Sequence, residues 1–116
     1  MNSEPHTFWN RYGEPIVVMR KTSANLPGLA IDRWDEVDVP FGLGRWVITH
    51  LPTDKRISRY YTYRDALRAA QYMAAHFDWS QPLADHDHRE RAYRIVVNAN
   101  RIVVNANRLA DSEDIP

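Results

Sequence analysis

The sequence predicts one α+β domain over residues 1–116: a small antiparallel sheet of three or four strands, one helix packed on it, and a long C-terminal helix. Three observations predict this fold. Two β-branched and aromatic runs flank a turn within residues 44–61, an amphipathic helical pattern follows at 62–77, and helical periodicity resumes over 88–110. A chain of 116 residues has the size of a single domain, and 44% hydrophobic residues can supply one core.

Residues 1–43 are expected to be irregular with short strands, because Pro5, Pro15, Pro27 and Pro40 interrupt them. The β-branched run 16–20 follows a Gly-Glu-Pro turn and predicts one strand, and residues 29–34 are a candidate for another. The acidic residues within 32–38 are most simply explained as a solvated loop.

Residues 45–51 and 56–61 predict the two strands of an antiparallel hairpin, with the turn at 52–55. Strict alternation along the second strand places Arg59 on one face with Ile57 and Tyr61. It places Arg56 on the other face with Ser58 and Tyr60.

A helix from about residue 63 to Phe77 is predicted by the capping box formed by Thr62 and Asp65. Its apolar face is formed by residues at helical spacing, namely Ala66, Leu67, Ala70, Met73, Ala74 and Phe77.

The heptad Arg-Ile-Val-Val-Asn-Ala-Asn at 94–100 is repeated without a change at 101–107, which indicates a recent in-frame duplication, natural or engineered. Seven residues are nearly two helical turns, so such an insertion lengthens a helix and rotates its face by only about 20°. Two short strands around Asn-Ala-Asn are the alternative, because β-branched residues and Asn are poor helix formers. A second capping box at Asp87 and Glu90 favours the helix.

The predicted C-terminal helix carries apolar residues on two sides. One side is a heptad seam, which we expect to be the interface of a homodimer: Ala92, Ile95, Ala99, Ile102, Ala106 and Leu109. The other side carries Tyr93, Val97 and Val104. A helix with two apolar sides needs two coverings, one from its own sheet and one from a second copy of the chain.

Composition excludes several classes of protein. Fifteen Lys and Arg balance fifteen Asp and Glu, which excludes a uniformly basic nucleic-acid coat and an acidic mimic of DNA. Thirteen of the basic residues are Arg, which either reflects a GC-rich genome or serves planar, bidentate contacts. The absence of Cys excludes disulfides and thiolate chemistry. With no signal peptide and no membrane-spanning run, we expect a cytoplasmic chain without a membrane partner.

No motif predicts an enzyme, a metal site or a cofactor. His86 and His88 alternate with Asp85 and Asp87, but this spacing does not put both imidazoles on one helical face, and a solvated helix start explains the run. His50 and other histidines lie near no nucleophile or phosphate-binding motif. We therefore expect no catalytic residues, no metal and no cofactor.

The hairpin and the helix after it carry basic residues among aromatic ones. Such a mixture is typical of a nucleic-acid-binding surface, for which the candidate contacts are Arg45, Arg56, Arg59 and Arg64. The alternative is a mixed-charge surface over a core that contains Trp46.

Residues 44–77 contain Gly-Arg-Trp-Val-Ile at 44–48, Arg-Ile at 56–57 and Thr-Tyr-Arg-Asp-Ala-Leu-Arg-Ala-Ala at 62–70. This segment resembles the N-terminal DNA-binding domains of apetala-type proteins and phage integrases. The resemblance implies a three-stranded sheet, followed by a capped helix, that reads the major groove with Arg45, Arg56 and Arg59. The Arg-rich, Trp-containing composition is also similar to that of small proteins of actinobacteria and their phages.

These observations predict first a non-catalytic protein that binds an unidentified protein target as a homodimer, such as a phage-type accessory or host-modulating factor. A DNA-binding protein that uses the basic hairpin 45–61 is the second hypothesis, and a small enzyme is the third.

Overall fold

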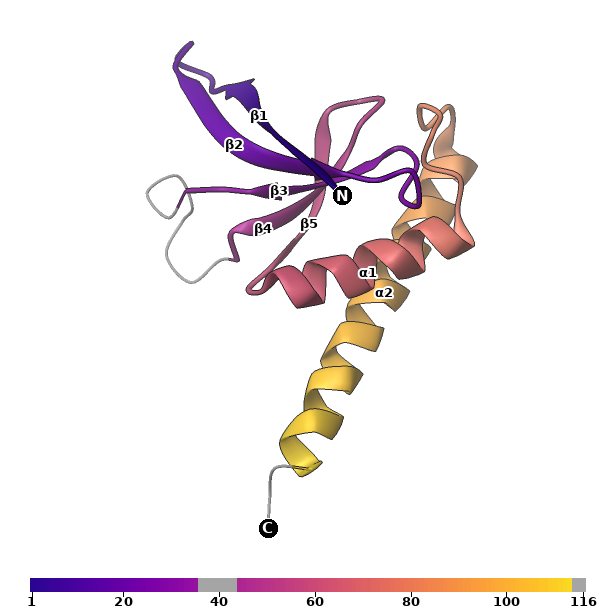
Figure 1. The fold of residues 1–116 in the computed structure, drawn as a ribbon. Coiled ribbons are helices and arrows are strands. Elements are labelled where there is room, and N and C mark those ends of the chain that lie inside the picture. The colour runs from indigo at the N-terminus through magenta and orange to yellow at the C-terminus, as the bar shows by residue number, and fades with distance from the viewer. Residues whose placement is uncertain (36–43, 114–116) are drawn as a thin grey trace.

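A five-stranded antiparallel sheet and two helices make up the fold in the computed structural model, which describes residues 1–35 and 44–113 (Figure 1). The strands follow one another across the sheet in chain order: β1 Asn2–Trp9, β2 Pro15–Thr22, β3 Leu29–Arg33, β4 Trp46–His50 and β5 Lys55–Tyr60. The α+β class is confirmed, but the sheet has five strands and not the predicted three or four.

The additional strand is β1, in the segment that the sequence predicted to be irregular. It pairs with β2 along its whole length, from Asn2 opposite Thr22 to Trp9 opposite Pro15. Pro5 does not prevent this pairing because β1 is an edge strand, where proline is tolerated. The predicted strands at 16–20 and 29–34 correspond to β2 and β3.

The explanation of the acidic run as a solvated loop was wrong for Asp32, which lies in β3 and is fully buried. The part of that run from residue 36 onward lies outside the described residues, as do residues 39–43. A buried carboxylate requires a partner, and Asp32 has one on β2, described below.

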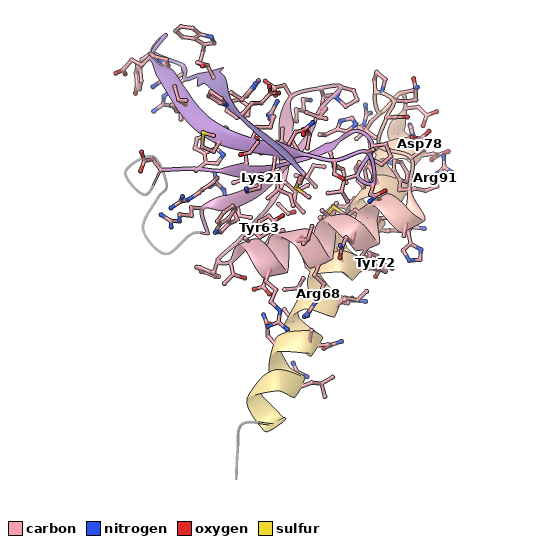
Figure 2. All side chains as sticks on the ribbon, in the orientation of Figure 1. Lys21, Tyr63, Arg68, Tyr72, Asp78 and Arg91 are labelled. Atoms are coloured by element: carbon pink, nitrogen blue, oxygen red, sulfur yellow. The ribbon has the colours of Figure 1, made fainter. Side chains whose placement is uncertain are left out.

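Helix α1, Tyr63–His76, begins at the predicted cap, where Thr62 Oγ1 accepts a 3.1 Å hydrogen bond from the backbone N–H of Asp65. It covers one face of β3, β4 and β5. The start of the helix is also joined to β2, because Lys21 Nζ lies 5.5 Å from the centre of the Tyr63 ring (Figure 2). The small alanines of α1 allow close packing on the sheet, and the core between them consists of Leu29, Ile31, Ile48, Tyr60, Ala66, Ala69, Ala70 and Met73.

Helix α2, His86–Glu113, runs without interruption through both copies of the heptad, so the two copies form a helix and not strands. It packs against α1 and the core as far as Val103, and Asn107 Nδ2 donates a 3.3 Å hydrogen bond to Asp65 Oδ2 at the start of α1. Its C-terminal end extends beyond α1 and the sheet (Figure 1). Three residues of α2 pack into the core that lies between the sheet and α1, namely Ala92, Ala99 and Val103.

The segment between the helices is anchored to the sheet by His50. Its Nε2 lies 2.9 Å from the carbonyl oxygen of Trp79 and 3.2 Å from that of Gln81, so this nitrogen carries the hydrogen and donates it. Its Nδ1 then accepts from Thr53 Oγ1 at 2.8 Å. Gly28 permits this close approach, because a Cβ there would lie 2.0 Å from the oxygen of Trp79.

Candidate nucleic-acid interface

The face of the sheet opposite α1, here called the inner face, holds a second and smaller apolar cluster. Val18, Trp34 and Val47 are its buried members, and Phe8 and Ile16 pack against them. These residues come from β1, β2 and β4 and from the end of β3, so the cluster spans most of the sheet. The inner face is therefore partly filled by side chains and not a flat surface.

A β-bulge decides which side chains of β5 reach the inner face. Ile48 is opposite Ser58, but the next residue, Thr49, is opposite Arg56, so Ile57 is the extra residue. Arg56 and Arg59 consequently share the inner face, although strict alternation predicted opposite faces. That prediction was wrong because a bulge changes the parity of the strand.

Both guanidinium groups lie over the ring of Trp34, with Cζ of Arg56 4.9 Å and Cζ of Arg59 5.7 Å from its centre. Phe8 of β1 stacks on the same indole at 5.4 Å and an interplanar angle of 21°. Trp34 is therefore only 2% exposed. Cations held over an aromatic ring are attracted by its electron-rich face, so this arrangement orients two arginines together.

Below this aromatic layer lies a buried ion pair. Arg20 Nε and Nη2 donate to the two oxygens of Asp32, each at 2.9 Å, and Thr49 Oγ1 donates to Asp32 Oδ2 at 2.7 Å. Burial alone would lower the pKa of Arg20, but hydrogen bonds to Asp32 and Asp54 and their negative charges raise it. Arg20 is thus held in its charged form in the interior.

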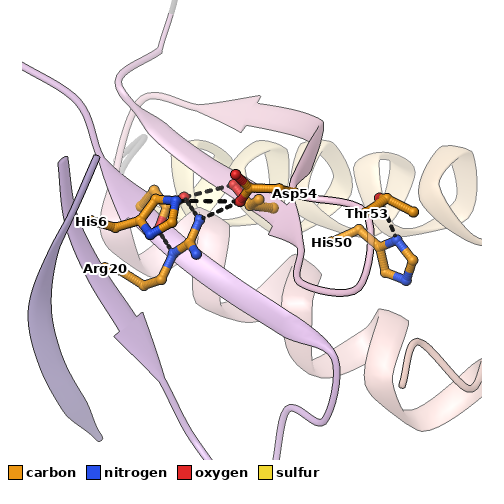
Figure 3. Close-up of polar contacts among 7 residues, drawn as sticks. His6, Arg20, His50, Thr53 and Asp54 are labelled. Atoms are coloured by element: carbon orange, nitrogen blue, oxygen red, sulfur yellow. Dashed lines mark hydrogen bonds and ion pairs between the residues drawn. The ribbon is translucent and has the colours of Figure 1, made fainter. Parts of the chain in front are cut away.

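Asp54, in the turn between β4 and β5, connects this turn to the first two strands (Figure 3). Its Oδ1 accepts from Arg20 Nη2 at 3.3 Å and lies 3.4 Å from His6 Nε2. Asp54 adopts a left-handed backbone conformation, with φ of 54°, that aspartate tolerates better than most residues. Because His6 is on β1 and Asp54 adjoins β5, the two edge strands approach each other across the inner face.

A groove of about 700 Å³ lies where these edges approach, and we call it the edge-strand groove. It is lined by Phe8, Trp9, Asn10, Arg11, Ile16, Trp34, Asp54, Lys55, Arg56 and Arg59. Four of these residues are basic and one is acidic. Burial and the neighbouring charge of Arg56 lower the pKa of Arg59, so the groove holds positive charges that repel each other. An anion bound there would relieve that repulsion.

The four predicted nucleic-acid contacts are distributed over three places. Arg56 and Arg59 lie together in the edge-strand groove. Arg45 lines a smaller pocket of about 220 Å³ beside Trp34. Arg64 is exposed on α1, which covers the opposite face of the sheet.

Phe8, Trp9, Arg11 and Trp34 were not predicted as site residues, because residues 1–43 were expected to be irregular with short strands. Alternation of His6 and Phe8 with polar residues was the available signal for β1. No local signal links β1 to β5, because their contact depends on the curvature of the whole sheet.

The fold buries part of the predicted dimer seam on α2 within the chain and leaves the rest exposed. Within one chain, Ala92 and Ala99 are buried, and Ile95 packs against the core. Ile102 and Leu109 are 38% and 65% exposed. Of the seam, Ile102, Leu109 and the half-buried Ala106 between them are available to a second copy.

The start of α2 is capped by Asp85, so the predicted capping box at Asp87 and Glu90 was wrong, because the helix begins at His86 and not at residue 88. Asp85 Oδ1 accepts a 2.8 Å hydrogen bond from the backbone N–H of His88, and His88 Nδ1 accepts one from Ala84 at 3.3 Å. Among the described residues, no cluster of three or more His, Cys, Asp or Glu could hold a metal ion. In the same part of the chain, no helix has the length and apolar character to cross a membrane.

Comparison with known proteins identifies no relative. No protein-family model matches the chain, and no curated protein or solved structure does so either. The edge-strand groove is therefore the feature from which a function can be inferred.

Proposed function

We propose that this chain is a non-catalytic macromolecule-binding protein and that it binds a nucleic acid in the edge-strand groove. The observation that supports this is the pair of arginines, Arg56 and Arg59, held side by side over Trp34. Arg11 and Lys55 line the same groove. Basic side chains bind phosphates through charge and through release of counterions, and aromatic groups beside them accommodate bases.

The charge of the groove favours a nucleic acid over a generic protein partner. The chain as a whole is neutral, with fifteen basic and fifteen acidic residues, so a groove with four basic residues and one carboxylate is a local concentration of positive charge. The single carboxylate, Asp54, is already engaged by Arg20. Little negative charge therefore opposes a phosphate backbone in this groove.

The resemblance of residues 44–77 to apetala-type and phage-integrase DNA-binding domains supports the same class of ligand. It implies three strands followed by a capped helix, and β3, β4, β5 and α1 have this connectivity. Two of the three arginines that it implies as contacts, Arg56 and Arg59, line the groove. A cytoplasmic location, as proposed from the sequence, would expose the protein to such ligands.

Equilibrium binding to fluorescein-labelled oligonucleotides, measured by anisotropy over a series of salt concentrations, tests this proposal. We expect affinity to fall as salt rises, and the Arg56→Ala/Arg59→Ala variant to reduce the log–log salt slope by about 1 to 2, because each lost phosphate contact removes about 0.7 to 0.9. The matched control is Arg64→Ala/Arg91→Ala, which removes the same charge from two exposed positions outside the groove. Absence of binding at low salt, or equal effects of the two variants, would contradict the proposal.

A second candidate function, self-association through α2, is favoured by the apolar residues that the C-terminal half of this helix exposes. Ile102 and Leu109, seven residues apart on one side of the helix, are 38% and 65% exposed. Apolar side chains in a row on one helix are stabilised when another helix covers them. We propose a second copy of the chain as that covering.

A further inference from the structure

The edge-strand groove presents its arginines and its indole from a recess. Trp34, at its floor, is 2% exposed, and Arg59 is half-buried, with Nη1 3.5 Å from the carbonyl oxygen of Gly44. Of the two arginines over the indole, only Arg56 is exposed. A ligand must therefore enter the groove to meet these groups.

The width of the sheet excludes the usual way in which β-strands read a DNA duplex. β-Strands that read double-stranded DNA enter a major groove about 12 Å wide and reach base edges about 8.5 Å below its rim. Five strands spaced about 4.8 Å apart form a sheet about 19 Å across, which is wider than that groove. In addition, the two edges of the sheet approach each other across the inner face, where His6 Nε2 on β1 lies 3.4 Å from Asp54 Oδ1 in the turn before β5.

A single-stranded nucleic acid does not have this limitation, because it is narrower than a duplex, is flexible and has unpaired bases. Its phosphates can approach Lys55, Arg56 and Arg59 along β5, at one wall of the groove. A volume of about 700 Å³ lies within the range of about 300–1,000 Å³ that is typical of sites for one small ligand. The groove thus has room for a short segment of one strand.

The opposite wall offers an exposed aromatic surface for a base. Trp9 lines the groove and is 69% exposed. Next to it, Arg11 stacks on Tyr12 with Cζ 5.0 Å from the ring centre, and Tyr12 is 71% exposed. Stacking on aromatic side chains and Arg is the means by which proteins hold unpaired bases of any sequence.

The turn that carries these residues is fixed in advance. Asn10 Oδ1 accepts from the backbone N–H groups of Tyr12 and Glu14, each at 2.9 Å. The backbone N–H of Asn10 donates to the oxygen of Glu14 at 3.0 Å and closes the turn. A rigid turn loses little conformational freedom when a base stacks on it, which favours binding.

We infer that the ligand of the edge-strand groove is a single-stranded nucleic acid, with phosphates beside Arg56 and Arg59 and an unpaired base stacked on Trp9. This inference rests on the proposed nucleic-acid function and specifies its ligand. It departs from the duplex that the resemblance of residues 44–77 implies.

The experiment compares three probes at one low and one physiological salt concentration: a 12-nucleotide deoxythymidine strand, the corresponding uridine strand, and the deoxythymidine strand annealed to its complement. We expect at least one single strand to bind at least 10-fold more tightly than the duplex. We expect Trp9→Ala to weaken binding of that strand by about 5-fold or more, the lower end of what one stacked base contributes. Trp9→Phe should restore most of the affinity, because it keeps an aromatic face.

The matched control is Tyr93→Ala, which removes a comparably exposed aromatic ring, 67% exposed on α2, and should leave affinity unchanged. Duplex binding as tight as that of both strands would overturn the inference but leave the proposed function standing. Equal effects of Trp9→Ala and Tyr93→Ala would also overturn it. If no probe binds at low salt, the proposed function fails, and the inference fails with it.

Discussion

Arg20 and Asp32 form a bidentate ion pair between the adjacent strands β2 and β3, with both donor–acceptor distances 2.9 Å and both side chains buried. The pair lies beneath the aromatic layer of Phe8 and Trp34, and Arg20 also reaches Asp54 in the turn before β5. It therefore connects the strands that form both walls of the edge-strand groove. Its integrity determines both the stability of the sheet and the shape of the groove.

Replacing Asp32 by Asn should destabilise the protein strongly. The substitution keeps the size of the side chain but removes the buried charge paired with Arg20, which keeps the exposed Asp54 as a carboxylate partner at 3.3 Å. Removing one partner of a buried ion pair costs about 3–5 kcal/mol. The measurement is the free energy of unfolding in urea. Asp35→Asn, at an exposed position close in sequence, is the control and should change it by less than about 0.5 kcal/mol. The double variant Arg20→Met/Asp32→Leu should be less destabilised than Asp32→Asn alone, and a larger loss would contradict this account.

Two glycines with nearly equal positive φ angles should differ in their tolerance of alanine. At Gly13, with φ of 76°, no atom lies within 4 Å of an added Cβ. Gly13→Ala should therefore lower the free energy of unfolding only through backbone strain, by about 1–2 kcal/mol. At Gly28, with φ of 79°, the Cβ would lie 2.0 Å from the carbonyl oxygen of Trp79. Gly28→Ala should therefore cost clearly more, and the difference in unfolding free energy between the variants measures the close approach. Equal costs would mean that the segment around Trp79 can move away freely.

The strands that were predicted correctly have strong local signals, whereas the groove depends on features without one. The run at 16–20, the hairpin at 45–61 and the cap at Thr62 are encoded by neighbouring residues, and β2, β4, β5 and α1 lie there. The bulge at Ile57 has no such signal, because it follows from how β5 is held against β4. Consequently Arg56 and Arg59 were identified as candidates but assigned to opposite faces.

Strand β1 is an element of the fold that was not predicted from the sequence. β1 has few β-branched residues and contains Pro5, so its own composition does not predict a strand. Eight residue pairs with β2 and the stacking of Phe8 on Trp34 stabilise it instead. The pairing with β2 is that of a hairpin between consecutive strands, but the stacking of Phe8 on Trp34 and the groove between β1 and β5 join segments distant in sequence. Local patterns therefore do not predict the groove.

Deleting one copy of the heptad, residues 101–107, should leave a folded protein. Arg108, Leu109 and Ala110 would then follow Asn100, and alanine would take the place of Val103, which is 5% exposed. The loss of two buried methyl groups is worth about 1.6 kcal/mol at about 0.8 kcal/mol each. Urea unfolding should therefore remain cooperative, with a loss similar to that of the control Val103→Ala. Loss of the cooperative transition would show that the second copy is required for folding.

Stability should fall at alkaline pH because of Tyr60. Burial raises the pKa of its hydroxyl, and this hydroxyl donates a hydrogen bond to Asn100 Oδ1 on α2. A raised pKa in the folded state means that the contribution to stability is complete below the unfolded pKa of about 10 and is lost as the pH rises through the folded pKa. Urea unfolding between about pH 8 and 11 should show this decline, and Tyr60→Phe should make it shallower. Tyr93→Phe, at an exposed position, should leave the slope unchanged, and a slope unaffected by Tyr60→Phe would contradict this assignment.

Self-association through α2 should depend on Ile102 and Leu109, the exposed apolar residues of the predicted seam. Ile102→Asp/Leu109→Asp introduces charges at two positions that are exposed in the single chain, so its unfolding free energy at low protein concentration should change little. In a dimer, the same aspartates would be buried without partners, and the dimer should dissociate. Light scattering coupled to size exclusion, at micromolar concentration, should give the mass of a dimer for the original chain and close to 13.6 kDa for the variant. Arg101→Asp/Arg108→Asp, two charged substitutions at exposed polar positions, is the control for charge alone and should remain a dimer. A monomeric mass for the original chain would exclude this mode of association.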